Sequence, residues 1–369
     1  MGVGRSGKAT SVTIATQRDI DATGRTLHRW FVARAGARVV HDVEVTPSKS
    51  GFSNETFMCR VRWSDAASNE HDDSLVLRIE PTHHQLFPTS DALHQAAVTE
   101  ALARACRLPL PQIRFTESES QWFGAAFYLM NRIDGRIPTD VPSYHKRGWV
   151  AELSAAERAR LYDNAVAKLA ELHQLDQRRV APVLSPMSST GSPLQAYVEH
   201  VTAWARWADA DLQINRSCIA EALRYVQRAL PGDVAPVVVW GDARIGNMIF
   251  GADLSVAAML DWEAATIGPA GIDVGWWLMF EEYICEASGL TRLPGIPSRD
   301  EMLERYESFR GRAVKNINYF EVLAALVFSL INSRLATLLR NAGVDERQAG
   351  QFAERSTGML SRGLDVANA

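Results

Sequence analysis

Cysteine and lysine are scarce in this sequence, and no stretch carries a long block of one charge. The four cysteines lie far apart and form no Cys-x-x-Cys pair, which argues against a disulfide framework or a zinc cluster. A reduced, cytoplasmic setting fits this pattern. Only five of the 39 basic residues are lysines, which shortens any search for a catalytic lysine. The net charge is −4 and no five basic residues adjoin, so the composition does not support a nucleic-acid partner.

Long apolar segments are also missing. No apolar run approaches the ~20 residues that span a bilayer, and the N-terminus lacks the apolar stretch of a signal peptide. We therefore expect no membrane partner. The 369 residues are 47% hydrophobic and 22% charged, which is typical of globular proteins and excludes a disordered chain. This length predicts about two domains.

The N-terminus contains a glycine-rich segment that imitates a phosphate-binding loop. Gly2, Gly4 and Gly7 match the pattern GxGxxG, and Lys8 extends the match towards a P-loop. Both motifs need a strand before the first glycine, and only one residue precedes it here. We therefore interpret residues 1–16 as a flexible N-terminal tail.

The pattern of apolar residues predicts a mostly antiparallel sheet with one inserted helix in roughly the first 130 residues. Residues 17–35 have helical spacing, and an Ala-rich segment over 91–105 predicts the inserted helix. The polar residues 64–73 are expected to form a loop. Strands are expected at 38–46, 54–63, 75–79, 112–117 and 122–130.

From residue 132 the pattern is mainly helical, so we divide the chain into one lobe over 17–131 and a second over 132–369. A capping box of Ser154 and Glu157 marks the start of a strong helix. A β-branched run over Pro236–Trp240 and a small hairpin over 248–260 interrupt the helices. Helices are expected at 155–175, 193–209, 216–229, 273–287, 299–312, 317–340 and 346–362.

The chemically informative residues are Asp242, Asn247 and Asp261. Four residues separate Asp242 from Asn247, the spacing of the base and the metal-binding Asn in protein kinases, and Asp261 ends a second β-branched strand. Asp242 can orient an acceptor hydroxyl and take its proton, so we assign it as the catalytic base. One carboxylate and one amide oxygen suit Mg²⁺, so we assign Asn247 and Asp261 as its ligands. Asp, Asn and Gly are also common in turns, but turns alone do not explain this ordered spacing after two strands.

This stretch resembles the phosphotransferase enzyme family that includes aminoglycoside, choline and homoserine kinases. The family signature reads HGD-x4-N, followed by an Asp-Trp-Glu or Asp-Phe-Glu strand end and a downstream Asp. The matching segments here are Trp240-Gly241-Asp242, Asn247, Asp261-Trp262-Glu263 and Asp273-Val274-Gly275. The resemblance implies an α+β, two-lobed, protein-kinase-like fold with a small antiparallel-sheet N-lobe and a larger, mainly helical C-lobe.

The resemblance also implies that ATP and Mg²⁺ are bound between the lobes, so that the lobe over 17–131 binds the nucleotide and the lobe over 132–369 holds the catalytic loop and the acceptor. The family has a turn over the phosphates, a cation on the third strand, and a hinge whose backbone contacts the adenine. The positions that match these features are Ser50, Phe52 and Ser53 in the turn, Arg78 on the strand, and Met130, Asn131 and Ile133 at the hinge.

Two positions depart from the family pattern. Trp240 replaces a His that supports the catalytic loop by packing and hydrogen bonding, so the change does not by itself predict inactivity. Arg78 replaces a Lys, and it stays charged and can grip two phosphate oxygens. Glu100 is the only acid well inside the inserted helix, and it is either the acidic partner of Arg78 or a solvated helix residue. By its distance from the helix end, however, the family position falls nearer Gln95 or Ala96.

Several other residues have two readings. His173 and Asp273 match family positions, and we interpret both as structural, with Asp273 bracing the catalytic loop. Glu263 fits a supporting role behind the metal or the substrate. Trp276 is expected in the core. The acidic cluster over 281–286 is either an exposed helix face or a rim for a cationic substrate.

Three functions are considered. The leading hypothesis is a Mg²⁺- and ATP-dependent kinase that phosphorylates a hydroxyl of a small molecule. The alternative is a pseudokinase that binds a nucleotide or a partner without catalysis. A metal-dependent hydrolase would need further metal ligands, such as a His near Asp242, and the sequence has none there. An aminoglycoside acceptor would require a strongly acidic cleft, whereas an apolar alcohol or a hydroxyacyl compound would not. The sequence leaves the acceptor and the oligomeric state open.

Overall fold

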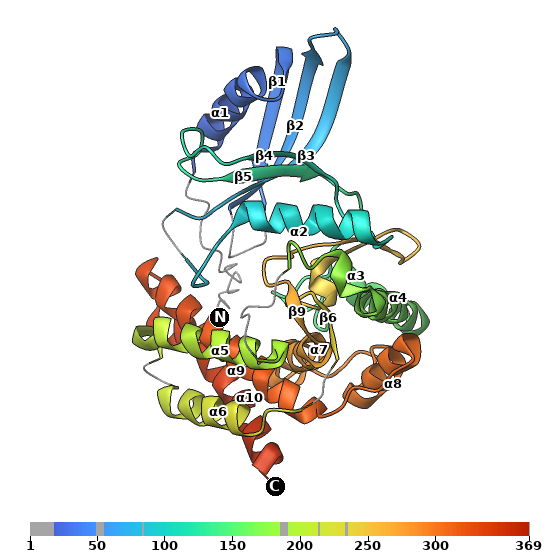
Figure 1. Cartoon of the computed structure of the whole chain (residues 1–369), viewed down its shortest axis with the longest axis vertical. Helices are drawn as coiled ribbons and strands as arrows, with labels where there is room; N and C mark the ends of the chain where they lie inside the picture. Colours follow the sequence, from blue (N-terminus) through green and yellow to red (C-terminus); the bar gives the residue numbers. More distant parts are fainter. Residues whose placement is uncertain are drawn as a thin grey trace, which may run out of the picture.

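The computed structural model describes residues 18–48, 55–82, 85–184, 191–212, 215–232 and 235–368. They form two lobes, a smaller one built on a β-sheet and a larger, mainly helical one (Figure 1). The chain leaves the sheet lobe after strand β5 (Phe127–Asn131) and enters the helical lobe.

The sheet lobe contains one antiparallel sheet with the strand order β1-β2-β3-β5-β4. The other strands are β1 (Ala37–Pro47), β2 (Glu55–Asp65), β3 (Glu70–Ile79) and β4 (Ile113–Glu117). Successive side chains of a strand point to opposite faces. On β2 every second side chain from Phe57 to Trp63 is buried, and helix α1 (Ile20–Ala33) covers this face with Trp30 and Phe31.

The β2–β3 hairpin is longer than the sequence predicted. The polar residues 64–73 were expected to form a loop, yet only 66–69 lie outside the two strands. Polar side chains pair along the hairpin, with Arg60 Nη2 2.7 Å from Asp72 Oδ2. The Asp65 carboxylate closes the turn by accepting two backbone N–H groups at 2.9 Å. Hydrophobicity alone therefore underestimated these exposed strands.

The opposite face of the sheet is turned towards the helical lobe. Its residues Val76, Tyr128 and Met130 pack against Ala96 of helix α2 (Ala92–Ala105). Figure 1 shows α2 between the sheet and the helical lobe. Groups on this face therefore meet groups that rise from the helical lobe.

A loop between β3 and α2 connects the lobes a second time. Leu86, with 6% of its surface exposed, packs against Leu335 and Leu339 of the helical lobe. Phe87 meets the ring of Trp204 edge-to-face at 5.5 Å. We call residues 80–91 the lobe-bridging loop, of which 83 and 84 lie outside the described residues.

The helical lobe holds most of the buried apolar residues in one continuous core. The helix predicted to begin at Ser154 does so, and its capping box with Glu157 forms. The helices are α3 (Trp149–Glu152), α4 (Ala155–Gln174), α5 (Pro193–Trp207), α6 (Arg216–Arg228), α7 (Gly271–Ile284), α8 (Arg299–Arg310), α9 (Ile317–Asn341) and α10 (Glu346–Asn368).

Two small antiparallel sheets lie in the helical lobe near the sheet lobe. The predicted hairpin forms as β7 (Met248–Phe250) and β8 (Val256–Met259). The β-branched run forms β6 (Pro236–Val239), which pairs with β9 (Thr266–Pro269). Strand β9 was not predicted, because it is only four residues long and includes a glycine and a proline. These short strands hold the candidate site.

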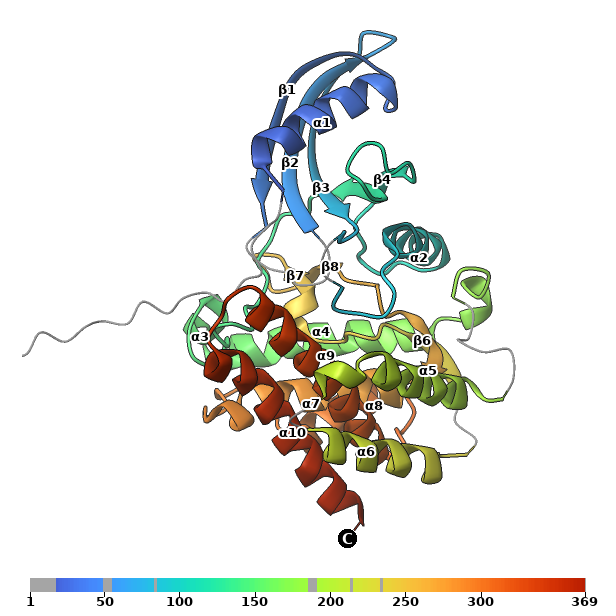
Figure 2. The same cartoon turned by 90° about the vertical axis from the view of Figure 1, so that its left-hand side faces the viewer.

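Helix α9 corrects one expectation. By length and composition it could cross a membrane, although no segment was expected to approach that length. Isolated polar residues interrupt its apolar run in the sequence. In the structure 83% of its most apolar 18-residue window is buried inside the protein, and α7 and α10 pack along it (Figure 2). This is the packing of a core helix.

Candidate functional site

The candidate catalytic loop follows β6 and begins with a sharp turn at Gly241. Its φ of +90° is strained for any residue with a side chain. A Cβ atom there would lie 2.4 Å from the carbonyl oxygen of Ala264. The glycine therefore lets the chain pass closely under the β8–β9 segment and presents Asp242 just beyond it.

The Asp242 carboxylate is held by three side-chain donors. Its Oδ1 accepts hydrogen bonds from Arg244 Nε at 2.9 Å and from Trp276 Nε1 at 2.7 Å. Its Oδ2 accepts from Asn247 Nδ2 at 2.6 Å, and the same nitrogen donates to the Asp242 carbonyl oxygen at 3.0 Å. The predicted base and the first predicted metal ligand are thus neighbours in space.

The Asp273 side chain supports the backbone at the start of this loop. Its fully buried carboxylate accepts from the backbone N–H groups of Trp240 and Gly241, both at 2.7 Å. It also lies 2.9 Å from His173 Nε2, and the other ring nitrogen meets the Tyr306 hydroxyl at 2.5 Å. His173 and Asp273 therefore have the structural contacts that the sequence indicated.

Trp240 links the catalytic loop to the strand that carries Asp261. Its side chain is fully buried, stacks on Trp262, and donates from Nε1 to the carbonyl oxygen of Leu260 at 2.9 Å. The Leu260 N–H in turn donates to the carbonyl oxygen of Asn247 at 2.9 Å. Asp261 therefore lies beside Asn247, and Trp240 packs and hydrogen-bonds where the family has a His.

Arg78 reaches the site from the sheet lobe. Its Nη2 donates to Asp261 Oδ1 at 3.2 Å and, at 3.5 Å, to Gln95 Oε1. Burial alone would lower the pKa of Arg78, but nearby Tyr128, Asp261 and Glu263 hold it above its ordinary value. Its Nε is buried, and no partner for it lies among the described residues. Arg78 is thus a buried cation whose Nε has no hydrogen-bond partner among the described residues.

The structure does not place Glu100 beside Arg78. The Glu100 carboxylate lies 3.7 Å from Arg104 on the same helix, and 43% of its side chain is exposed. Gln95 instead faces the strand, and its Nε2 donates to Glu263 Oε2 at 3.3 Å. A neutral amide on α2 therefore connects Arg78 to a carboxylate in the Asp-Trp-Glu segment.

The hinge residues lie where the two lobes join. The Asn131 N–H donates to the carbonyl oxygen of Gln112 at 2.9 Å, and the Arg132 N–H to that of Ser74 at 3.0 Å. Within the described ranges, the Ile133 N–H makes no backbone hydrogen bond, so it could donate one to a nucleobase. The predicted phosphate turn with Ser50, Phe52 and Ser53 lies outside the described residues.

The donor set fits a hard cation only in part. Among the described residues, no group of three or more His, Cys, Asp and Glu side chains could hold a metal ion by itself. Asp261 offers a carboxylate, and Asn247 offers its amide oxygen because its nitrogen is turned to Asp242. Mg²⁺ commonly binds through one or two such protein ligands and completes its shell with phosphates and water. These two residues match that pattern.

Sequence reasoning missed three residues of the site. Arg244 lies in the motif itself, two positions after Asp242, and could have been found by asking what balances that carboxylate. Trp276 was expected to be a core residue, and it is buried, but its indole N–H also reaches Asp242. Asp140, which pairs with Arg244 Nη1, has no local signal, because the two positions are 104 residues apart.

The acidic cluster after Trp277 is partly buried and partly exposed. Glu281 is buried and accepts from the hydroxyls of Tyr144 and Tyr162. The two more exposed carboxylates, Glu282 and Glu286, pair with arginines. The expectation of an exposed helix face is therefore wrong for Glu281, and it agrees with the half-exposed Glu282 and Glu286.

The fold and the site together define the class of this protein: a two-lobed, protein-kinase-like protein in which Asp242, Asn247 and Asp261 lie together between the lobes. The chain belongs to the phosphotransferase enzyme family (APH), and the match covers residues 44–314.

Solved structures of the same fold include phosphotransferases with bound nucleotide. A candidate aminoglycoside phosphotransferase from Ralstonia eutropha has a TM-score of 0.67 at 20% identity, over 93% of this chain and 98% of that one. Aminoglycoside phosphotransferase APH(4)-Ia, in a ternary complex with AMP-PNP and hygromycin B, has a TM-score of 0.54 at 15% identity, over 92% and 99%. Macrolide 2′-phosphotransferase type I has a TM-score of 0.55 at 16% identity, over 95% and 99%. At these identities the likeness shows the fold alone.

Two curated proteins that match this chain in sequence are not named as phosphotransferases. Acyl-CoA dehydrogenase family member 11 from Gallus gallus is 24% identical over 337 residues, which cover 88% of this chain and 40% of that protein. Its namesake from Rattus norvegicus is 26% identical over 290 residues, covering 76% and 34%. The chain thus spans well under half the length of these relatives.

Proposed function

We propose that this protein is a Mg²⁺-dependent kinase that transfers the γ-phosphoryl group of ATP to a hydroxyl of a small molecule. The convergence of Asp242, Asn247, Asp261 and Arg78 at one place between the lobes carries this proposal. A nucleotide-binding fold alone would not require a carboxylate that is held ready for an acceptor next to the metal ligands.

In this proposal Asp242 is the base. The acceptor oxygen forms a bond to the γ-phosphorus, the bond from that phosphorus to the β–γ bridging oxygen breaks, and ADP leaves with the electron pair. The acceptor proton passes to the Asp242 carboxylate. The three donors on that carboxylate fix its direction, and positioning of this kind supplies much of the rate of phosphoryl transfer.

The nucleotide would be held by both lobes. Asn247 and Asp261 would hold Mg²⁺, which neutralises phosphate charge when bound. The buried, unused Nε of Arg78 is a donor that a phosphate oxygen would satisfy. The Ile133 N–H is available to the adenine, together with the hinge positions Met130 and Asn131. The turn with Ser50, Phe52 and Ser53 stays a prediction for the phosphate cover.

A hollow on the inner face of the sheet supports a nucleoside site beside the hinge. It has a volume of about 390 Å³, and Met58, Ser74 and Arg132 are among its lining residues. The Ser74 carbonyl oxygen accepts from the Arg132 N–H, which places this hollow directly next to the hinge.

The acceptor is proposed to be an uncharged or anionic hydroxyl compound. Glu281 is already saturated by internal hydrogen bonds, so this carboxylate does not offer a free acidic wall to an aminoglycoside. The curated relatives are named acyl-CoA dehydrogenases, and this name makes hydroxyacyl thioesters the first acceptors to test. We place the reaction in the cytoplasm, in keeping with four free cysteines.

Thermal unfolding with nucleotide tests the proposal. A ligand at ~100 times its dissociation constant stabilises the folded state by about 2.7 kcal/mol, which corresponds to roughly 3–4 °C for a chain of this length. We expect this shift with Mg²⁺ and ATP, and its loss in Asp261→Asn. Asp242→Asn should still bind the nucleotide.

An ADP-release assay over a panel of hydroxyacyl thioesters, simple alcohols and aminoglycosides tests transfer. Asp242→Asn should lower turnover by orders of magnitude. Metal-dependent binding without transfer to any member of the panel would instead favour the pseudokinase. A wild-type protein that shows no shift with Mg²⁺ and ATP would refute the nucleotide site.

A further inference from the structure

Arg244 connects the candidate base to a second carboxylate. Its Nε donates to Asp242 Oδ1 at 2.9 Å, and its Nη1 contacts Asp140 Oδ2. Its guanidinium carbon lies 4.8 Å from the ring centre of Phe280. Burial opposes its charge, but Asp140 and Asp242 hold the pKa of Arg244 above its ordinary value. The Arg244 guanidinium is therefore held by Asp242 through Nε, by Asp140 through Nη1, and by the ring of Phe280 on one face.

The catalytic loop leaves room for this pair at Gly246. A Cβ atom there would lie 2.4 Å from Arg244 Nη1 and 2.7 Å from Asp140 Oδ1. Asp140 Oδ1 is itself buried, and no hydrogen-bond partner for it lies among the described residues. The Asp140–Arg244 pair thus fills a space that the loop provides.

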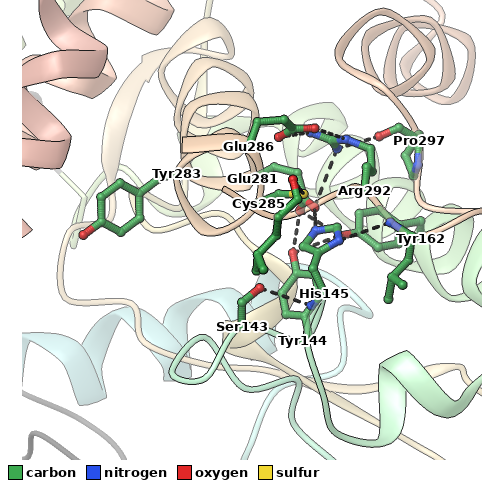
Figure 3. Close-up of polar contacts among 12 residues, drawn as sticks. Ser143, Tyr144, His145, Tyr162, Glu281, Tyr283, Cys285, Glu286, Arg292 and Pro297 are labelled. Carbon is green, nitrogen blue, oxygen red and sulfur yellow. Dashed lines mark hydrogen bonds and ion pairs between the residues drawn. The ribbon is translucent and has the colours of Figure 1, made fainter. Parts of the chain in front are cut away.

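The segment that carries Asp140 is anchored a few residues further on. Tyr144 and His145 both reach Glu281 on helix α7, with His145 Nε2 2.6 Å from Glu281 Oε1 (Figure 3). The Tyr162 hydroxyl adds a third bond to Glu281, at 2.7 Å. Burial alone would raise the pKa of Glu281, but its partners outweigh burial and lower it. We call these four residues the Glu281 anchor.

Helix α7 therefore acts on Asp242 by two routes. One turn of the helix supplies Trp276, whose indole donates directly to the carboxylate. A later turn supplies Glu281, which holds the segment of Asp140, and Asp140 holds Arg244. Both routes end on the same oxygen, Asp242 Oδ1.

We propose that Asp140 is a positioning residue for phosphoryl transfer, which fixes the direction of the Asp242 carboxylate through Arg244. The Glu281 anchor keeps Asp140 in place. This inference rests on the proposed function of Asp242. Without the Asp140 charge, Arg244 would turn fully towards Asp242 and compete with the acceptor hydroxyl for its oxygens.

The central experiment compares Asp140→Asn with a matched control, Asp163→Asn. Asp163 also pairs with an arginine, Arg305, at 2.6 Å between α4 and α8, but this pair is more exposed and lies away from the site. Asp140→Asn should lower kcat by about 10- to 100-fold, the scale expected when a reacting group is misplaced by about 1 Å. The dissociation constant for Mg²⁺ and AMP-PNP should change less than twofold, and Asp140→Glu should recover part of kcat.

A spectroscopic signal reads the same effect without turnover. Trp276 donates to Asp242, so its indole N–H resonance in a ¹H–¹⁵N spectrum reports the position of that carboxylate. Its assignment comes from its loss in Trp276→Phe. We expect this resonance to move in Asp140→Asn and in Glu281→Gln, and to stay in place in Asp163→Asn.

The outcomes separate this inference from the proposed function. If wild-type protein binds no Mg²⁺ and AMP-PNP, the kinase proposal fails, while the Trp276 resonance still shows whether Asp140 positions Asp242. If that resonance stays in place in Asp140→Asn, or if kcat stays within twofold of wild type, the positioning role is refuted. If Asp140→Asn unfolds, Asp140→Ser replaces it, because it also removes the charge; a resonance and a kcat equal to those of Asp163→Asn would then refute the positioning role.

Discussion

Replacement of Asp273 by asparagine removes a buried charge on which the catalytic loop rests. The aspartate is fully buried and accepts from two backbone N–H groups at 2.7 Å and from His173 Nε2 at 2.9 Å. Asparagine has the same shape, so the change leaves no cavity. Its amide nitrogen, however, must face one of these donors, because a side-chain amide offers only one acceptor oxygen.

The expected cost follows from these contacts. Removing one partner of a buried, hydrogen-bonded charge typically costs about 3–5 kcal/mol. The entropy of unfolding is roughly 2.1 cal/mol/K per residue, which for 369 residues converts this cost to a fall in Tm of about 4–6 °C. Asp300→Asn is the control, since the Asp300 side chain is 82% exposed and, within the described part of the chain, its ion pair is with its neighbour Arg299.

Thermal unfolding followed by circular dichroism measures this difference. Asp273→Asn should melt several degrees below both the wild type and Asp300→Asn, with an unchanged far-ultraviolet spectrum at 20 °C. If Asp273→Asn melted within 1 °C of Asp300→Asn, the carboxylate would not support the loop, and the description of Asp273 as a brace would be wrong.

Three more outcomes follow from the packing. Gly241→Ala should destabilise the protein by about 2 kcal/mol or more in urea unfolding, because φ is +90° and the new Cβ would meet a backbone oxygen; unchanged stability would contradict this geometry. Leu86→Ala should lower the free energy of unfolding by about 2–5 kcal/mol, although Leu86 lies in a loop. Val141→Ala, at a position that is 65% exposed, should be neutral by the same assay. Equal effects would mean that the lobe-bridging loop is not docked on the helical lobe. Burial raises the pKa of Cys59 to about 12, so its thiol stays protonated at pH 8 and should react with iodoacetamide more slowly than the half-buried Cys106. Peptide mass spectrometry measures the two rates, and equal labelling would argue against a buried Cys59.

The Asp242, Asn247 and Asp261 pattern could be predicted because it is local. Each acid follows a short apolar run, so the sequence places it at a strand end, and four residues between Asp242 and Asn247 are enough to turn both into one space. The fold class came from the resemblance of the same stretch to the phosphotransferase family, and the one inserted helix in a sheet agreed with it. These features depend on neighbours in sequence, where spacing is informative.

The partner of Arg78 could not be chosen by charge. Glu100 has the chemistry of a partner, but it lies near Arg104 at the surface. Gln95 and Thr99 lie on the buried face of α2, so the face of the helix, rather than the charge of the residue, decides which side chain meets Arg78. Asp140 was beyond reach for another reason, since its partner lies 104 positions away.

The contacts of Asp273 constrain the order in which the protein can fold during its synthesis. They join it to His173, 100 positions earlier, and to Trp240, 33 positions earlier. Such distant contacts form late, because a long loop must close first. When the ribosome has added residue 261, every residue of the Asp242–Asn247–Asp261 pattern has been synthesised. Asp273, which supports their geometry, has not. The geometry of this pattern can therefore be completed only after Asp273 has been synthesised.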